Sequence, residues 1–190
     1  MSIQKEIEFK NLLTKEEFDQ LCRGFNISKQ DFHLQTNTYF DTPDNQFRDA
    51  FIGFRLRVLE ERNELTLKSP GENVHTMIET THLISSSERN EILLSGEIKP
   101  RIYNEFQQLP ELLVAFGTLR TERAEVPYQN GLLVLDRSDY LEHTDYEMEF
   151  EVTDLEKGQQ SFNKLLEIYQ IPKRQTLKKI ARFMTKAQRK

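Results

Sequence analysis

The chain of 190 residues has one cysteine, no tryptophan and no long run of apolar residues. The single cysteine, Cys22, excludes an internal disulfide framework and is typical of a reducing compartment, so we expect a cytoplasmic location. No apolar run approaches the ~18 residues of a membrane-spanning helix, and the first residues lack the apolar core of a signal peptide. We therefore expect no membrane partner.

The common motifs for binding nucleotides and zinc are also missing. There is no glycine-rich phosphate loop of the Walker type and no G-x-G-x-x-G, so any phosphate would have to be bound by Lys and Arg side chains. The four histidines show no ligand spacing, which disfavours zinc. The net charge of −5 argues against a nucleic-acid partner.

What the chain does have is a high content of charge together with 13 Phe and 6 Tyr, enough to build a core. Its length predicts a single domain over residues 1–190. Periodicity and turn signals predict strands over 3–10, 32–41, 52–60, 63–69, 74–84, 113–126, 130–136 and 145–153. They predict helices over 14–25, 156–169 and 175–188, a helical turn over 45–50 and short helices within 86–108. This order predicts an α+β fold with a mostly antiparallel sheet.

The most informative strand is the first one, which reads Glu6-Ile7-Glu8-Phe9-Lys10. Successive side chains on a strand point to opposite faces, so the three charged residues share one face and the two apolar residues share the other. The two carboxylates would lie about 6.6 Å apart along the strand, with an ammonium beside them. Such a face could hold a divalent cation and a phosphate together.

Several other predicted strands repeat this alternation of charged and apolar residues. Their charged faces carry Arg55 with Arg57, Lys68, Arg123, Asp136, and Glu147 with Glu149 and Glu151. The ordinary explanation for one such strand is a half-buried sheet whose polar face meets water. However, like charges bunched along a strand repel one another and need compensation. We therefore expect a closed sheet with helices outside and the charged faces lining its lumen.

The carboxylates of these faces suggest which metal the protein uses. Hard oxygen ligands favour Mg²⁺ or Mn²⁺. The candidate metal ligands are Glu6, Glu8, Glu79, Asp136, Glu147, Glu149 and Glu151.

In order along the chain, these motifs resemble those of the CYTH superfamily, the triphosphate tunnel metalloenzymes. The matching segments are Glu6-x-Glu8-x-Lys10, Tyr39-Phe40-Asp41-Thr42, Arg55-Leu56-Arg57, Leu65-Thr66-Leu67-Lys68, Glu79, Arg123, Leu135-Asp136, Glu147-x-Glu149-x-Glu151 and Lys178-Lys179-Ile180-Ala181-Arg182-Phe183. The resemblance spans nearly the whole chain. It implies a closed eight-stranded antiparallel β-barrel that forms a tunnel, with helices packed on the outside.

The resemblance also implies an activity: a metal-dependent hydrolase of inorganic triphosphate, thiamine triphosphate or a nucleotide. It implies metal ligands at Glu6, Glu8, Glu147 and Glu149, with Glu6, Glu8, Lys10 and Arg57 essential for catalysis. The residues expected to bind the triphosphate are Lys10, Arg55, Arg57, Lys68, Arg123, Lys179 and Arg182.

Some alternatives remain open at this point. Either the 147/149 or the 149/151 glutamate pair could hold the metal, and either Lys178 or Lys179 could be the tunnel lysine. Adenylate cyclases of the family carry a His-Phe dipeptide ahead of the first strand. This dipeptide is absent here, which argues against cyclase activity without excluding it. A binding module without turnover is the other alternative. The organic portion of the substrate and the oligomeric state cannot be read from the sequence.

Overall fold

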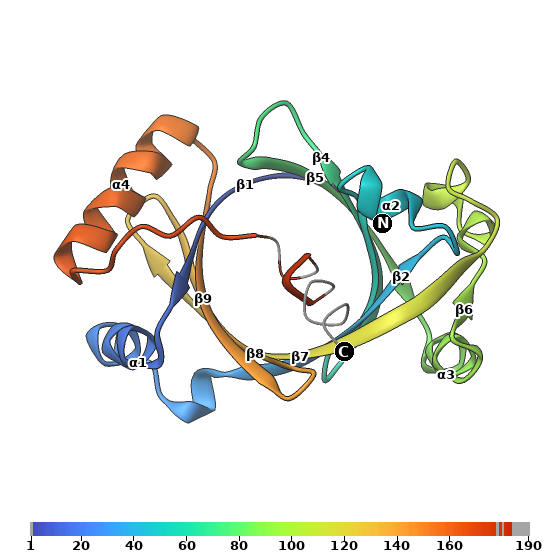
Figure 1. The fold of residues 1–190 in the computed structure, drawn as a ribbon, viewed down its shortest axis with the longest axis horizontal. Helices are drawn as coiled ribbons and strands as arrows, with labels where there is room; N and C mark the ends of the chain where they lie inside the picture. The colour runs from blue at the N-terminus through green and yellow to red at the C-terminus, as the bar shows by residue number, and fades with distance from the viewer. Residues whose placement is uncertain (1, 178, 180, 184–190) are drawn as a thin grey trace.

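A closed barrel dominates the computed structural model, which describes residues 2–177, 179 and 181–183. Its eight strands follow the order β2-β3-β4-β5-β1-β9-β8-β7, and pairing of β2 with β7 closes the ring, as Figure 1 shows in a view along the barrel. The strands are β1 (Ser2–Leu13), β2 (His33–Asp41), β3 (Gly53–Val58), β4 (Asn63–Pro70), β5 (Thr76–Ile84), β7 (Leu113–Tyr128), β8 (Gly131–Tyr140) and β9 (His143–Val152). All of these pairings are antiparallel, which confirms the predicted fold class.

The first strand joins the two halves of the barrel. Residues 2–7 of β1 pair with β5, and residues 7–13 pair with β9. The register sets Lys10 opposite Glu149 and Glu8 opposite Glu151. Because directly opposed residues of an antiparallel pair share a face, these four side chains lie on the same wall.

One apolar core lies outside the barrel, beneath α1 (Lys15–Gly24) and α4 (Leu155–Ile168), on the left in Figure 1. Phe9 points outward from β1 and stacks on Phe162 of α4, with ring centroids 5.5 Å apart. Helix α1 begins with a capping box, in which the Thr14 hydroxyl accepts from the Glu17 amide while the Glu17 carboxylate accepts from the Thr14 amide. The apolar faces of β1 and β9 are thus covered by helices, and their charged faces turn inward.

A second core lies on the opposite side, under α2 (Gln46–Asp49), α3 (Ser86–Ser95) and the 3₁₀ turns η2 (Pro100–Ile102) and η3 (Asn104–Phe106). Leu56 and Leu65 point outward from β3 and β4 into this core. A further 3₁₀ turn, η1 (Lys29–Asp31), precedes β2. Asp41 accepts hydrogen bonds from the backbone amides of Phe47 and Arg48 and so fixes α2 to the end of β2.

Three details differ from the sequence predictions. A two-residue strand, β6 (Glu97–Ile98), pairs with β7 where only short helices were expected. Strand β7 runs through Pro127, which the turn signals had placed in a loop; a proline is tolerated there because β7 has already left the β2 ladder at residue 123. Residues 175–177 are not helical, while Lys179 and 181–183 are; the rest of the helix predicted over 175–188 lies outside the described residues.

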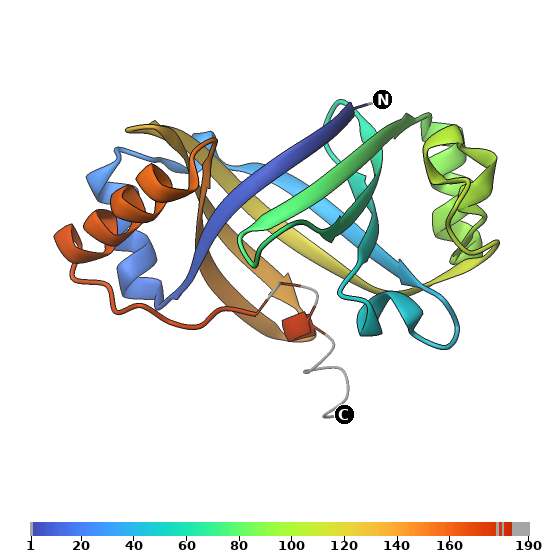
Figure 2. The ribbon, with the colours of Figure 1, turned by 90° about the horizontal axis from the view of Figure 1, so that it is seen from above.

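Residues 172–177, which we call the strap, follow α4 and cross the edge of the barrel at one of its ends, leading the chain toward the opening of the ring (Figure 1 and Figure 2). Asn11 donates to the Pro172 carbonyl, and the Leu12 amide donates to the Thr176 hydroxyl. Arg174 grips the Glu17 carboxylate through two hydrogen bonds of 2.8 Å each. The strap therefore fixes where Lys179 and Arg182 enter the barrel.

Candidate functional site

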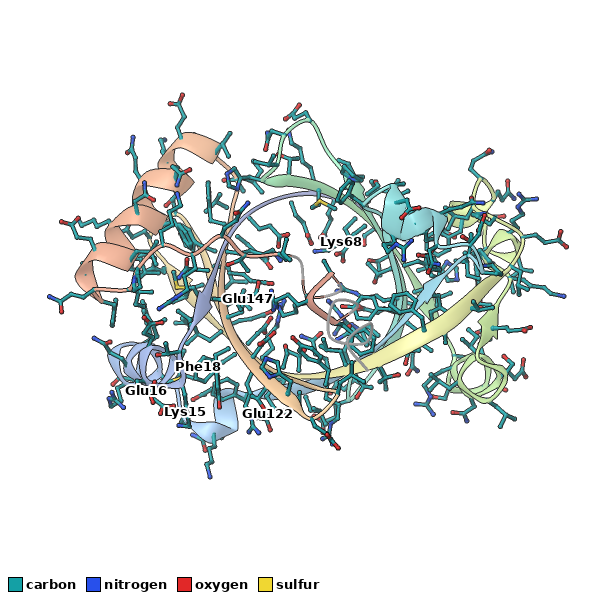
Figure 3. All side chains as sticks on the ribbon, viewed as in Figure 1. Lys15, Glu16, Phe18, Lys68, Glu122 and Glu147 are labelled. Carbon is teal, nitrogen blue, oxygen red and sulfur yellow. The ribbon has the colours of Figure 1, made fainter. Side chains whose placement is uncertain are left out.

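The lumen of the barrel is lined by charged side chains from most of its strands. Figure 3 shows Lys68 and Glu147 on the inner side of the ring, whereas Lys15, Glu16 and Glu122 lie outside it. The strand alternation explains this division, because residues two apart share a face. The charges form two clusters of ion pairs.

The first cluster centres on Glu149. Lys10 donates to Glu149 at 2.8 Å and lies 3.1 Å from Glu8. Arg123 donates to both oxygens of Asp136, at 2.8 and 2.7 Å, and also to Glu149 at 2.8 Å. Asp136 has no solvent-exposed surface, so its charge depends on these partners.

The C-terminal segment completes this cluster. Lys179 donates to Asp136 and, at 2.8 Å, to Glu149. Arg182 donates to Glu147 at 2.5 Å and to Asp145 at 2.9 Å. The structure thus brings Lys179 into the lumen, while Lys178 lies outside the described residues.

The second cluster lies on the opposite wall. Lys68 donates to Glu6 at 2.5 Å and lies 3.1 Å from Glu79. Arg55 reaches Glu79 at 3.5 Å. Arg57 has weaker compensation, because its nearest carboxylate oxygen, on Glu64, is 3.9 Å away.

Arg57 marks a region of surplus positive charge. Its pKa falls to about 10 because the group is buried and because Arg55 and Arg123 repel its charge. The attraction of Glu79 and Glu64 does not offset these effects. An anion bound beside Arg57 would supply the missing compensation.

Glu151 marks a region of surplus negative charge. Burial raises its pKa to about 7, and repulsion from Glu149 and Glu6 adds to this effect despite the attraction of Arg123. A hollow of about 420 Å³ opens next to Glu6 and Glu151, between the start of β1 and the end of β9. The C-terminal residues contact the other end of β9, through Asp145.

The carboxylate of Glu149, at the centre of the first cluster, is held ionised by cations. Burial alone would raise the pKa of Glu149, but Lys10, Lys179 and Arg123 hold it well below its usual value. The reciprocal effect raises the pKa of Lys10 well above its usual value, since Glu149 and Glu8 outweigh burial. The centre of the lumen is therefore a network of full charges.

The donor set fits a hard divalent cation, although the carboxylates are not gathered around one point. Within the described residues, no three acidic, His or Cys side chains are close enough together to form a ready metal site. However, one carboxylate oxygen of Glu147 is buried without a hydrogen-bond partner, and Glu151 lies in excess negative charge. A bound cation would give the Glu147 oxygen a partner and would compensate the excess negative charge at Glu151. To bind it, the glutamates would have to turn away from their present Lys and Arg partners.

The structure brings the described site residues named from the sequence to the lumen, but it divides them between the two clusters and leaves Glu151 without an ion pair in either. Sequence reasoning left two acidic partners out of the site. Asp145 extends the alternation of Glu147, Glu149 and Glu151 by one step, and Glu64 occupies the same face of its strand as Lys68. The period of two was the signal that could have found both.

Comparison with known proteins places this geometry in a family. The family model described as the CYTH domain matches residues 4–184. The chain belongs to the CYTH domain family. A relative from Bacillus subtilis (strain 168), named "Putative triphosphatase YjbK", is 38% identical over 185 residues, which cover 96% of each chain.

Two solved structures have the same fold. A structure from Bacillus halodurans, described as a putative adenylate cyclase, is 36% identical with a TM-score of 0.87 over 96% of this chain and 99% of that one. A putative adenylyl cyclase from Hippeastrum, whose structure is described as revealing a dominant triphosphatase activity, is 24% identical with a TM-score of 0.76. That alignment covers 96% of this chain and 95% of that one, and it shows the shared fold.

Proposed function

We propose that this protein hydrolyses a triphosphate with the aid of Mg²⁺ or Mn²⁺, and that inorganic triphosphate is its substrate. The observation that carries the proposal is the separation of uncompensated charge inside one barrel. Surplus positive charge lies at Arg57, where the pKa falls to about 10. Surplus negative charge lies at Glu151, where the pKa rises to about 7. A polyanion together with a cation matches both.

The name of the Bacillus subtilis relative supports the same activity. Within the described residues, no helix has the length and apolar character needed to cross a membrane. A cytoplasmic location, where small triphosphates are available, is part of the proposal.

The residues divide into two groups by charge. Lys10, Arg55, Arg57, Lys68, Arg123, Lys179 and Arg182 would bind and align the phosphate groups, because Lys and Arg neutralise phosphate oxygens. Glu6, Glu8, Glu147 and Glu149 would hold the divalent cation, with Glu151, Glu79 and Asp136 as the further acidic candidates. When bound, that cation neutralises phosphate oxygens and lowers the pKa of a water.

The protein's own contribution is positioning and electrostatic stabilisation. Five of its cations, Lys10, Arg55, Arg57, Lys68 and Arg123, lie on strands of a closed barrel, so they need little reorganisation when charge develops on the transferring phosphate. In the present arrangement every one of these cations except Arg57 lies within 3.5 Å of a carboxylate oxygen. Binding of triphosphate therefore exchanges internal ion pairs for ion pairs with phosphate, and the released carboxylates become free to bind the metal.

The test is release of phosphate from inorganic triphosphate by purified protein with Mg²⁺ or Mn²⁺. We expect Glu6→Gln and Arg57→Ala to remove nearly all turnover, by about 10²-fold or more, as for loss of one preorganised electrostatic group. Glu122→Gln and Arg137→Ala are matched controls, because this pair lies outside the lumen, 3.2 Å apart. Unchanged turnover in both lumen variants would refute the site.

A second candidate reaction is cyclisation of ATP, favoured by the description of the Bacillus halodurans structure as "a putative adenylate cyclase". Analysis of the products formed when the purified protein is incubated with ATP distinguishes the two reactions. Hydrolysis yields phosphate, whereas cyclisation yields pyrophosphate and cyclic AMP. Tight binding of triphosphate with no product under either metal would instead identify a binding module.

A further inference from the structure

Thr66 occupies the middle of β4 on the lumen side. Its neighbour Leu65 points outward into the second core. In the register, Thr66 lies directly opposite Arg55 on β3 and Thr81 on β5. Because directly opposed residues share a face with Cβ atoms about 4.5–5.5 Å apart, the Thr66 hydroxyl lies beside the Arg55 side chain inside the barrel.

The Thr66 hydroxyl is fully buried and lacks a hydrogen-bond partner among the described residues. Arg55 Nε is also buried and unpartnered, since Arg55 reaches Glu79 only through its terminal NH2 group at 3.5 Å. The Thr81 hydroxyl donates to Glu79 instead. Two donors that could point at one acceptor are therefore both unused.

An unsatisfied buried polar group destabilises a fold, and valine has nearly the same shape as threonine without the hydroxyl. A threonine at this place is thus unfavourable for stability alone. The adjacent guanidinium repels cations, so the missing partner is an anion with oxygen acceptors. Among the described residues, no side chain supplies it.

We propose that the Thr66 hydroxyl and Arg55 Nε–H donate hydrogen bonds to one phosphate group of the bound triphosphate. This inference rests on the proposed function. It adds an uncharged donor whose hydrogen bond depends on the direction of the phosphate oxygen. Lys68, two residues along the same face of β4, would contact the same polyanion as a point charge. The hydroxyl therefore fixes the orientation of the phosphate chain along β4.

The experiment compares Thr66→Val, Thr66→Ser and Thr80→Val with wild type. Thr80 is the matched control, because it is the next residue after Glu79 on β5 and faces away from the lumen. Thermal unfolding is followed in EDTA with increasing inorganic triphosphate, and KM and kcat for phosphate release are measured with Mg²⁺. The unfolding series reports binding without turnover.

Without triphosphate, we expect Thr66→Val to unfold at the wild-type temperature or above it. Its affinity for triphosphate should fall by about tenfold or more, the loss expected for a hydrogen bond to a charged acceptor, mainly as a higher KM. Thr66→Ser should keep most of the affinity because it keeps the donor, and Thr80→Val should bind as wild type does.

Wild-type affinity in Thr66→Val would overturn the inference, as would an equal loss in Thr80→Val. Arg57→Ala separates this failure from failure of the proposed function. If Arg57→Ala loses binding while Thr66→Val does not, only the role of Thr66 is wrong. If wild-type protein is not stabilised by triphosphate and releases no phosphate with Mg²⁺, both are wrong.

Discussion

Replacing Arg123 with methionine tests whether the ion pairs of the lumen depend on one another. Arg123 donates three hydrogen bonds of 2.7 to 2.8 Å to Asp136 and Glu149. Its removal leaves Asp136, which has no exposed surface, with Lys179 as its remaining cation. Breaking a buried pair in this way costs about 3–5 kcal/mol. For a chain of this size that corresponds to a fall in Tm of about 6–20 °C.

Arg137→Met provides the matched control on the neighbouring strand. Arg137 points outward to Glu122 at 3.2 Å, with both side chains nearly half exposed, so its loss should cost less than about 1 kcal/mol. The assay is thermal unfolding in EDTA by circular dichroism. The double variant Arg123→Met with Asp136→Asn should be less destabilised than the sum of the two single variants, because the orphaned charge is gone. Equal Tm values for Arg123→Met and Arg137→Met would refute the reasoning.

Three other perturbations have expected outcomes. Arg174→Met releases the strap from Glu17, so turnover of triphosphate should fall several-fold. The Tm should change little because the ion pair is partly exposed, and kinetics and thermal unfolding on the same sample check both results. Gly117→Ala places a Cβ against the Phe183 ring, so this ring must shift from its position and turnover should fall, whereas a wild-type rate would show that the position of the ring is unimportant. Burial would raise the pKa of Glu79, but its cationic neighbours hold it at about 2. Glu79 therefore contributes stability that is present above about pH 4.5 and lost as the pH falls toward 2, and Glu79→Gln should flatten the acid limb of a plot of unfolding free energy against pH.

The inward and outward faces could be predicted from the sequence because strand alternation is a local property. Ile7 and Phe9 pack outside the barrel and Glu8 and Lys10 lie inside it, as their spacing indicated. The partner of each charge could not be predicted in the same way. Lys68 and Glu6 meet across the lumen side of β4, β5 and β1, and this contact depends on the tilt and stagger of the closed sheet rather than on sequence spacing.

Local sequence patterns could not predict the path of the C-terminal segment either. The Asn11 side chain accepts a hydrogen bond from the Arg174 amide and donates one to the Pro172 carbonyl. Pro172 and Arg174 belong to no periodic pattern of apolar and polar residues that would have predicted these contacts. The position of Lys179 depends on the strap, because a one-residue shift on a helix turns the side chain by about 100°. Only long-range contacts could place Lys179 against Asp136.

The pairing of β1 with β9 has a consequence for how the protein is made. Glu8 and Glu151 face each other although most of the chain separates them. A nascent chain that has not reached β9 therefore presents the edge of residues 7–13 unpaired, and contacts so distant in sequence form slowly. Closure of the ring and assembly of the acidic wall occur in the same step. We therefore expect a ribosome-bound fragment that lacks β9 to be inactive and to expose an unpaired strand edge, which a chaperone would have to shield.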